Sequence, residues 1–122
     1  MIQIAWQYEV KEENRSKFEL AYGPGGAWSN LFAWAPGYRG TVLLRDAEDP
    51  RKYLTFDVWD TEEDHLDFLN QRREEYAAMR AAFSELVISE ASLGVYKLLS
   101  EATVRRAPGS ARGRTNPRRR SR

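Results

Sequence analysis

The chain has 122 residues, enough for one domain with a single hydrophobic core, and 42% of them are hydrophobic. It contains no cysteine and one histidine, His65, which excludes disulfides, zinc–thiolate sites and cysteine nucleophiles. The formal net charge is +1, so the chain as a whole is neither strongly basic nor strongly acidic.

Charge is distributed very unevenly along the chain. Residues 105–122 hold eight arginines and no acidic residue, which leaves a formal charge of −7 on residues 1–104. The basic segment contains prolines and glycines and almost no large apolar side chain, so it cannot bury enough surface to offset its ordering entropy. We therefore expect a folded domain at residues 1–104 and a disordered arginine-rich tail at residues 105–122.

The first third of the chain predicts a strand followed by an interrupted helix. Residues 2–10 alternate large apolar side chains with polar or small ones, which is typical of a strand. Asn14 is a candidate N-cap for a helix that the glycine- and proline-rich residues 23–26 must interrupt. The helix resumes over residues 27–35 and is expected to end at Pro36.

The remainder of the domain predicts two strands, a long helix and a last strand. Alternation favours strands over residues 38–46 and 52–59, joined by an acidic turn. Thr61 precedes three acidic residues, as expected at a helix start, so we interpret that acidic run as a first turn and not as a metal site. Apolar spacing extends this helix to about residue 86, with a break near Arg72, and residues 93–99 predict the final strand.

The order of the elements is β-α-β-β-α-β, which predicts an α+β domain of the ferredoxin-like type with an antiparallel sheet. Two helices cover only one face of such a sheet, yet the strands carry large apolar side chains on both faces. An uncovered apolar face of this size typically meets a partner. We therefore predict a homodimer in which two sheets pack face to face. No apolar run is long enough to span a membrane, and the first residues lack a secretory pattern, so we expect no membrane association and a cytoplasmic location.

Several short blocks, in a characteristic order, resemble the antibiotic biosynthesis monooxygenase family of the dimeric α/β-barrel group. They are Phe18-Glu19, Ala21-Tyr22-Gly23-Pro24, Gly26-Ala27-Trp28, Leu31-Phe32, Pro36-Gly37-Tyr38, the Gly40–Asp46 segment, the Tyr53–Trp59 segment and Leu93-Gly94-x-Tyr96. The resemblance covers about residues 2–99. It implies a ferredoxin-like protomer, a dimeric α/β-barrel, and a pocket between sheet and helices in each protomer.

The family resemblance also implies a chemistry. Some members oxygenate hydroxylated aromatic or polyketide-like compounds without metal or flavin, so we expect a monooxygenase of this kind with no cofactor. Such a reaction needs aromatic walls, a base with a pKa near the working pH, and an oxyanion donor. The candidate catalytic residues are Gln7, Asp57, Trp59 and His65, with Asp57 or His65 as the base and Gln7 or a tyrosine hydroxyl as the donor. The candidate substrate-pocket residues are Tyr22, Trp28, Phe32, Tyr53, Phe68 and Tyr76.

Each candidate also has a structural interpretation. The large aromatic residues are typical of a core or a dimer contact. Asp57 lies in mid-strand, where an acid is unusual, and it could pair with Arg39 or Arg45 across the sheet. His65 could be a solvated residue of the first helical turn, and Gln7 could bond a neighbouring backbone group.

Other functions are weighed against the oxygenase. Heme-degrading relatives use Asn, Trp and His at positions that align with Gln7, Phe68 and Ala78, so this chain lacks their residues. An RNA-binding sheet is disfavoured because Asp57 and the acidic domain would repel phosphates. The remaining alternatives are a non-catalytic protein that holds a small apolar ligand, and polyanion binding through the arginine-rich tail.

Overall fold

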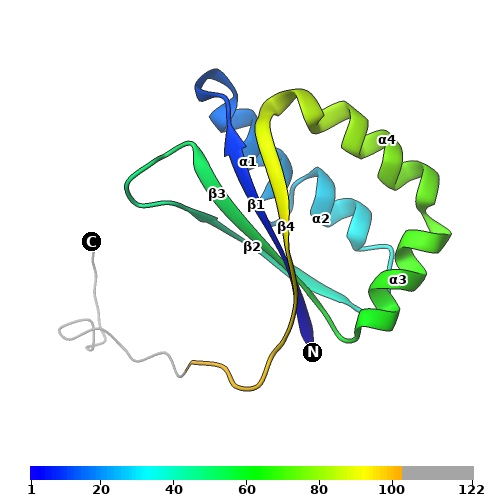
Figure 1. Cartoon of the computed structure of the whole chain (residues 1–122). Coiled ribbons are helices and arrows are strands. Elements are labelled where there is room, and N and C mark those ends of the chain that lie inside the picture. The colour runs from blue at the N-terminus through cyan, green and yellow to red at the C-terminus, as the bar shows by residue number, and fades with distance from the viewer. Residues whose placement is uncertain (103–122) are drawn as a thin grey trace, which may run out of the picture.

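The computed structural model describes residues 1–102 as one antiparallel sheet with a layer of helices on one face (Figure 1). In chain order its elements are β1 (Ile2–Val10), α1 (Arg15–Tyr22), α2 (Ala27–Phe32), β2 (Tyr38–Arg45), β3 (Lys52–Trp59), α3 (Glu62–Gln71), α4 (Arg73–Phe83) and β4 (Val87–Lys97). The strand order is β2-β3-β1-β4. This is the ferredoxin-like α+β arrangement, and the predicted fold class is confirmed.

Several predicted boundaries agree with the structure. β3 begins and ends at the predicted residues. The Thr61 hydroxyl accepts a hydrogen bond from the Asp64 N–H at 3.0 Å, which caps α3 as its sequence predicts. The long helix is divided at Arg72 into α3 and α4, and the glycine-rich segment separates α1 from α2.

Other boundaries differ. β4 begins at Val87, well before the predicted residue 93, because pairing with β1 extends through a polar stretch that lacks apolar alternation. It also ends at Lys97 rather than 99. α2 ends at Phe32, three residues earlier than predicted, because the chain turns ahead of Pro36. Asn14 occupies the N-cap position of α1, but its side chain makes no capping hydrogen bond there.

The hydrophobic core lies between the sheet and the helices. Alternate residues of β1 and β3 point into it, and α1, α2 and α3 cover them. The residues buried to 2% exposure or less at its centre are Val10, Phe18, Tyr53, Trp59 and Phe68. Gly26 allows α2 to start close to the end of α1, because a Cβ there would collide with the carbonyl oxygens of Leu20 and Ala21.

The opposite face of the sheet has no helix over it in the described residues (Figure 1). Val42 and Leu44 of β2 are 45% and 47% exposed, although their strand lies in a four-stranded sheet. They pair with Phe56 and Leu54 of β3, which are partly buried, so apolar side chains continue across both strands. This surface, which we call the open face, is the one from which the sequence predicts a sheet-to-sheet dimer.

No helix among residues 1–102 is both long and apolar enough to cross a membrane. The predicted disordered tail at residues 105–122 and the polyanion binding suggested for it lie outside the described residues.

Candidate functional site

A cavity of about 40 Å³ opens between the sheet and the helical layer. Aromatic rings form most of its wall, and a carboxyl, a hydroxyl and an ion pair provide its polar groups. It is lined by Trp6, Tyr8, Tyr22, Trp28, Phe32, Thr55, Asp57, Tyr76, Arg80 and Glu90. Every element of the helix-covered side except α3 and β2 contributes a side chain, so the fold itself assembles the site.

Asp57 is the acidic group on the sheet side of this cavity. It belongs to the face of β3 that points toward the helices, where it lies between Ile4 of β1 and Thr41 of β2 in register. Burial raises the pKa of the Asp57 carboxyl from 3.8 to about 6, although a hydrogen bond from the Thr41 hydroxyl opposes this shift. That bond joins Thr41 Oγ1 to Asp57 Oδ1 at 2.8 Å. A carboxyl with this pKa is poised to accept and release a proton near neutral pH.

The predicted pairing of Asp57 with an arginine is not observed. Arg39 instead forms a bidentate bond with Asp60, with both nitrogen–oxygen distances at 2.7 Å. Arg45 binds Glu19 at 3.1 Å. Burial therefore raises the pKa of Asp57 without a neighbouring cation among residues 1–102 to oppose it.

Two phenol hydroxyls and one indole N–H can donate hydrogen bonds into the cavity. Burial raises the pKa of the Tyr8 and Tyr22 phenols, so both stay protonated and can donate across the pH range in which Asp57 titrates. Trp28 is 9% exposed, and its buried indole Nε1–H meets no acceptor at standard hydrogen-bond geometry among residues 1–102, although it lies close enough to the Tyr22 oxygen to lower the pKa of that phenol slightly against the effect of burial. A buried donor without a partner is costly unless a ligand or water accepts its hydrogen bond.

An ion pair lies on the outer side of the cavity. Arg80 of α4 binds Glu90 of β4 at 2.6 Å, and its guanidinium lies 5.5 Å from the centre of the Trp6 ring. A hydrogen bond with Tyr76 is the main reason that the pKa of Arg80 is raised, so Arg80 remains a cation. α4 itself contains no buried residue, and it contacts the core through the partly buried Tyr76, Met79 and Phe83.

The structure brings together only part of the predicted site. Asp57 and the pocket candidates Tyr22, Trp28, Phe32 and Tyr76 all line the cavity. Gln7 does not: it is exposed on the opposite side of β1 from Trp6 and Tyr8, because neighbouring residues of a strand point to opposite faces. Gln7 is therefore not placed to donate to an oxyanion in this cavity.

Three further candidates form a packed cluster beside the cavity. Trp59 is completely buried, and its ring contacts those of His65 and Phe68 with centroid distances of 5.1 Å and 5.7 Å. Burial lowers the pKa of His65, so the imidazole is neutral near pH 7, and it is not a fully solvated first-turn residue. None of the three lines the cavity.

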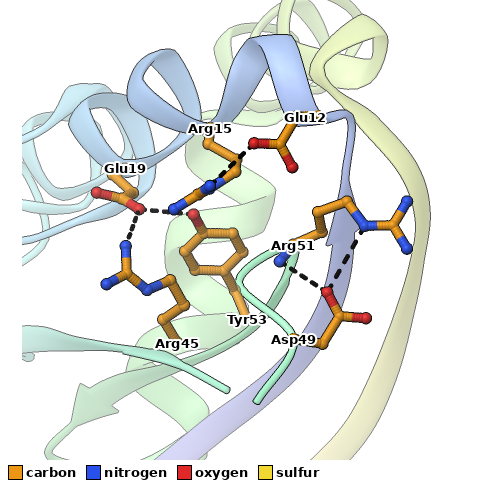
Figure 2. Close-up of polar contacts among 7 residues, drawn as sticks. All are labelled: Glu12, Arg15, Glu19, Arg45, Asp49, Arg51 and Tyr53. Carbon is orange, nitrogen blue, oxygen red and sulfur yellow. Dashed lines mark hydrogen bonds and ion pairs between the residues drawn. The ribbon is translucent and has the colours of Figure 1, made fainter. Parts of the chain in front are cut away.

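Tyr53 has a different role from the one predicted for it. Its hydroxyl donates to Glu19 at 2.6 Å, and Arg45 binds the same carboxylate oxygen (Figure 2). Arg15, which bonds Glu12 at 3.0 Å, lies next to this pair. The network ties α1 to β2 and β3 at the other end of the sheet, and it gives Tyr53 a structural position away from the cavity.

Five lining residues were absent from the predicted site: Trp6, Tyr8, Thr55, Arg80 and Glu90. Strand alternation places Thr55 on the same face as Asp57, and helical spacing places Arg80 four residues after Tyr76, so both were accessible to sequence reasoning. Glu90 was not, because the sequence did not predict that β4 extends to it. Among residues 1–102 no group of three or more His, Asp or Glu side chains is arranged to hold a metal ion.

A family model described as antibiotic biosynthesis monooxygenase matches residues 1–85. The chain belongs to this family. Comparison with curated proteins gives no match. A proposed antibiotic biosynthesis monooxygenase from Bordetella bronchiseptica is similar in structure, with a TM-score of 0.64 and 23% identity over 81% of this chain and 97% of that one.

Two more solved structures show the same fold. SnoaB, a cofactor-independent oxygenase from Streptomyces nogalater, aligns with a TM-score of 0.59 and 19% identity over 88% of this chain and 96% of its own. A proposed antibiotic biosynthesis monooxygenase from Nitrosomonas europaea aligns with a TM-score of 0.60 and 15% identity, covering 82% of this chain and all of that one. The family match therefore places the chain among monooxygenase-type proteins, and the structural matches support the fold.

Proposed function

We propose that this protein is a cofactor-independent monooxygenase that acts on a hydroxylated aromatic or polyketide-like substrate. The observation that carries the proposal is Asp57, a carboxyl with a pKa of about 6 that faces a cavity with aromatic walls. Membership of the antibiotic biosynthesis monooxygenase family supports the reaction class.

The base in this mechanism is Asp57. Its carboxylate takes a proton from an acidic C–H or O–H of the bound substrate, and the electron pair stays on the substrate as a delocalised anion. That anion reduces dioxygen, which is the co-substrate. For a methylene substrate the balance is R₂CH₂ + O₂ → R₂C=O + H₂O, so one oxygen atom enters the product and the other leaves as water. The substrate supplies all the electrons.

The developing anion needs hydrogen-bond donors on the helical side of the cavity. The Trp28 indole N–H is suited to this role, because it is buried without a partner among the described residues. Arg80 adds a positive charge at the outer edge, where it is balanced by Glu90. The phenols of Tyr8 and Tyr22 are protonated and can also donate. Together these groups replace Gln7 as the proposed donors.

The cavity must widen to admit an aromatic substrate. Its volume of about 40 Å³ holds water molecules, whereas pockets for drug-sized ligands are roughly 300–1,000 Å³. α4 is the wall that can move at least cost, because it has no buried residue and is linked to β4 through the Arg80–Glu90 pair. Outward movement of α4 would carry Tyr76 away from Trp28, whose rings now lie 5.3 Å apart.

Oxygen uptake by the full-length protein tests the proposal. The assay uses anthrones, quinols and catechols with no added metal or flavin, and product analysis accompanies it. With an active substrate, Asp57→Asn should lower kcat/KM by about 100-fold or more. The wild-type rate should fall as the pH drops below about 6, because Asp57 then becomes protonated.

Asp67→Asn is the matched control, because Asp67 is an exposed acid on α3 that does not line the cavity. Uptake that survives in the Asp57→Asn variant would contradict the assigned base. Saturable binding of panel compounds without product would favour the alternative, a protein of this fold that holds a small apolar ligand.

We also propose that the protein forms a homodimer through the open face. Val42 and Leu44 are almost half exposed there, and a contiguous apolar surface of this kind marks an interface. Light scattering of the full-length protein should give twice the chain mass at micromolar concentration, and Leu44→Arg should give a folded monomer. Leu20→Arg is the matched control, because Leu20 is 78% exposed on α1, away from the open face. A wild-type monomer would overturn this proposal. A cytoplasmic location remains a prediction from the sequence.

A further inference from the structure

A series of hydrogen bonds runs from Asp57 into the helical layer. Asp57 Oδ1 lies 2.8 Å from Thr41 Oγ1, which lies 2.5 Å from the Tyr38 hydroxyl. Tyr38 in turn lies 3.2 Å from Ser29 Oγ, and Ser29 lies 3.3 Å from the Gly23 carbonyl oxygen. This hydroxyl chain joins β3, β2, α2 and the turn that follows α1.

Counting protons shows that the chain depends on the charge of Asp57. There are four contacts, but the three hydroxyls supply only three protons. With Asp57 ionised, Thr41 donates to the carboxylate and Ser29 donates to the Gly23 carbonyl, so Tyr38 can fill only one of its two contacts, with Thr41 or with Ser29. A protonated Asp57 brings the fourth proton. All four contacts are then filled, with every donor directed from Asp57 toward the Gly23 carbonyl.

We propose that Asp57, Thr41, Tyr38 and Ser29 form one hydrogen-bond chain whose direction reverses when Asp57 gains a proton. Thr41 and Tyr38 are then positioning residues for the base: Thr41 bonds Oδ1 in both charge states of the carboxyl, and Tyr38 bonds Thr41. Both charge states of the carboxyl stay hydrogen-bonded, so proton uptake leaves no buried group unpaired. This inference rests on the proposed function, because it assigns partners to the base named there.

Within the described residues, the side-chain hydrogen bond to Asp57 comes from the Thr41 hydroxyl, and no titratable group makes one. The titratable groups that share its cavity are Tyr8 of β1, Tyr22 of α1, Tyr76 and Arg80 of α4, and Glu90 of β4. The two charged members, Arg80 and Glu90, pair with each other. The hydroxyl chain is therefore the direct polar contact of Asp57 on its β2 side.

Nuclear magnetic resonance of the full-length protein tests the chain without any substrate. With ¹³C labels at Asp Cγ and Tyr Cζ, the protein is titrated from pH 4 to pH 8. Asp57 should titrate near 6, and the Tyr38 Cζ signal should shift with the same midpoint. Asp57→Asn should abolish that shift. Signals are assigned by their loss in the Asp57→Asn and Tyr38→Phe variants.

Two substitutions at Thr41 separate a role in the chain from a role in packing. Thr41→Val keeps the shape but removes the hydroxyl, so it should raise the pKa of Asp57 by about one and uncouple Tyr38 from it. Thr41→Ser should restore both properties. Tyr38→Phe should raise the pKa by a smaller amount, and it provides a second test should Thr41→Val fail to fold.

Tyr8 is the internal reference, because it senses the charge of Asp57 through space and not through the chain. The pH-dependent shift of the Tyr8 Cζ signal should persist in the Thr41→Val variant. The shift of the Tyr38 Cζ signal should fall there to the size of the Tyr8 shift or below it. A Tyr38 signal that stays flat in the wild type, or that keeps its full response in Thr41→Val, would overturn the inference. Oxygen uptake is scored separately, so a coupled chain in a protein without turnover would contradict the proposed function alone.

Discussion

Two aromatic clusters lie next to each other under the same helices, and they differ in what their polar atoms contact. The first, which we call the Trp59 cluster, packs Trp59 against Phe32, His65 and Phe68, of which only Phe32 lines the cavity. The second, the cavity cluster, places Trp28 and other rings around the Asp57 carboxyl. Phe32 contacts both clusters and forms the boundary between them.

The difference shows why aromatic content alone does not identify a site. Trp59 is more deeply buried than Trp28, and both have an indole N–H without a partner in the described residues. Only Trp28 faces a space that a ligand can enter and an acid that can take a proton. We therefore expect changes in the Trp59 cluster to affect folding, and changes at the polar groups of the cavity, such as Asp57, to affect function at little cost in stability.

The largest expected effect is on stability, in the Trp59 cluster. Phe68→Ala removes a ring that is 2% exposed between Phe32 and Trp59, and it should lower the free energy of unfolding by about 3–5 kcal/mol. Leu66→Ala on the same helix is the matched control, since Leu66 is 50% exposed and should lose less than about 1 kcal/mol. Urea denaturation measures both. Equal losses would show that the Trp59 cluster is not the structural centre.

In the cavity cluster, Asp57→Asn should raise the free energy of unfolding, whereas Phe68→Ala lowers it. Because the folded protein raises the pKa of Asp57 from 3.8 to about 6, it binds this proton more tightly than the unfolded chain does. The resulting stabilisation is complete below about pH 4 and is lost as the pH rises through 6. At pH 8 the ionised, partly buried carboxylate therefore costs about 3 kcal/mol, and Asp57→Asn should be more stable than the wild type by up to about that amount.

This gain should disappear at pH 4, and urea denaturation at several pH values measures it. His65 contributes a dependence of the opposite direction, since its pKa is lowered, but it is present in both proteins and cancels in the comparison. The difference in unfolding free energy between Asp57→Asn and the wild type could instead be the same at pH 8 and pH 4. That result would show that burial does not destabilise the ionised form of Asp57. A variant that is more stable and less active would show that stability is given up for function at this position.

The sequence predicts the two clusters unequally, for physical reasons. Alternation in β3 places Asp57 and Trp59 together on one face, but large side chains on both faces leave open which face the helices cover. The same alternation in β1 separates Gln7 from Trp6, but only the position of the helices shows which of the two faces the cavity. Glu90 escapes prediction because its strand is defined by pairing with β1 across a bulge and not by its own pattern.

The sequence also does not predict that Asp57 lines a cavity whereas Trp59 is fully packed. The two residues are two positions apart and share a face, so periodicity treats them alike. What distinguishes them is packing by residues distant in the chain: Phe68 and His65 fill the space beside Trp59, whereas the space beside Asp57 is bounded by the half-exposed α4. A cavity is the result of incomplete packing, and no local pattern records it.

The smallest expected effect concerns the wall that closes the cavity. The Arg80–Glu90 pair is short, at 2.6 Å, but its side chains are 43% and 30% exposed, so its contribution to stability is about 0.2–1 kcal/mol. Glu90→Gln should therefore leave global unfolding nearly unchanged. If the pair holds α4 in place, amide hydrogen exchange in residues 76–83 should become about two- to fivefold faster, because local opening of α4 costs less.

Glu75→Gln is the matched control for this wall, because Glu75 also belongs to α4 and binds Arg72 at 3.0 Å, but contacts no lining residue of the cavity through that bond. It should leave exchange in residues 76–83 at the wild-type rate. Unchanged exchange in Glu90→Gln would mean that the rings of Tyr76 and Phe83, and not the ion pair, hold α4 against the cavity. Faster exchange confined to Glu90→Gln would show that the Arg80–Glu90 pair holds α4 against the cavity.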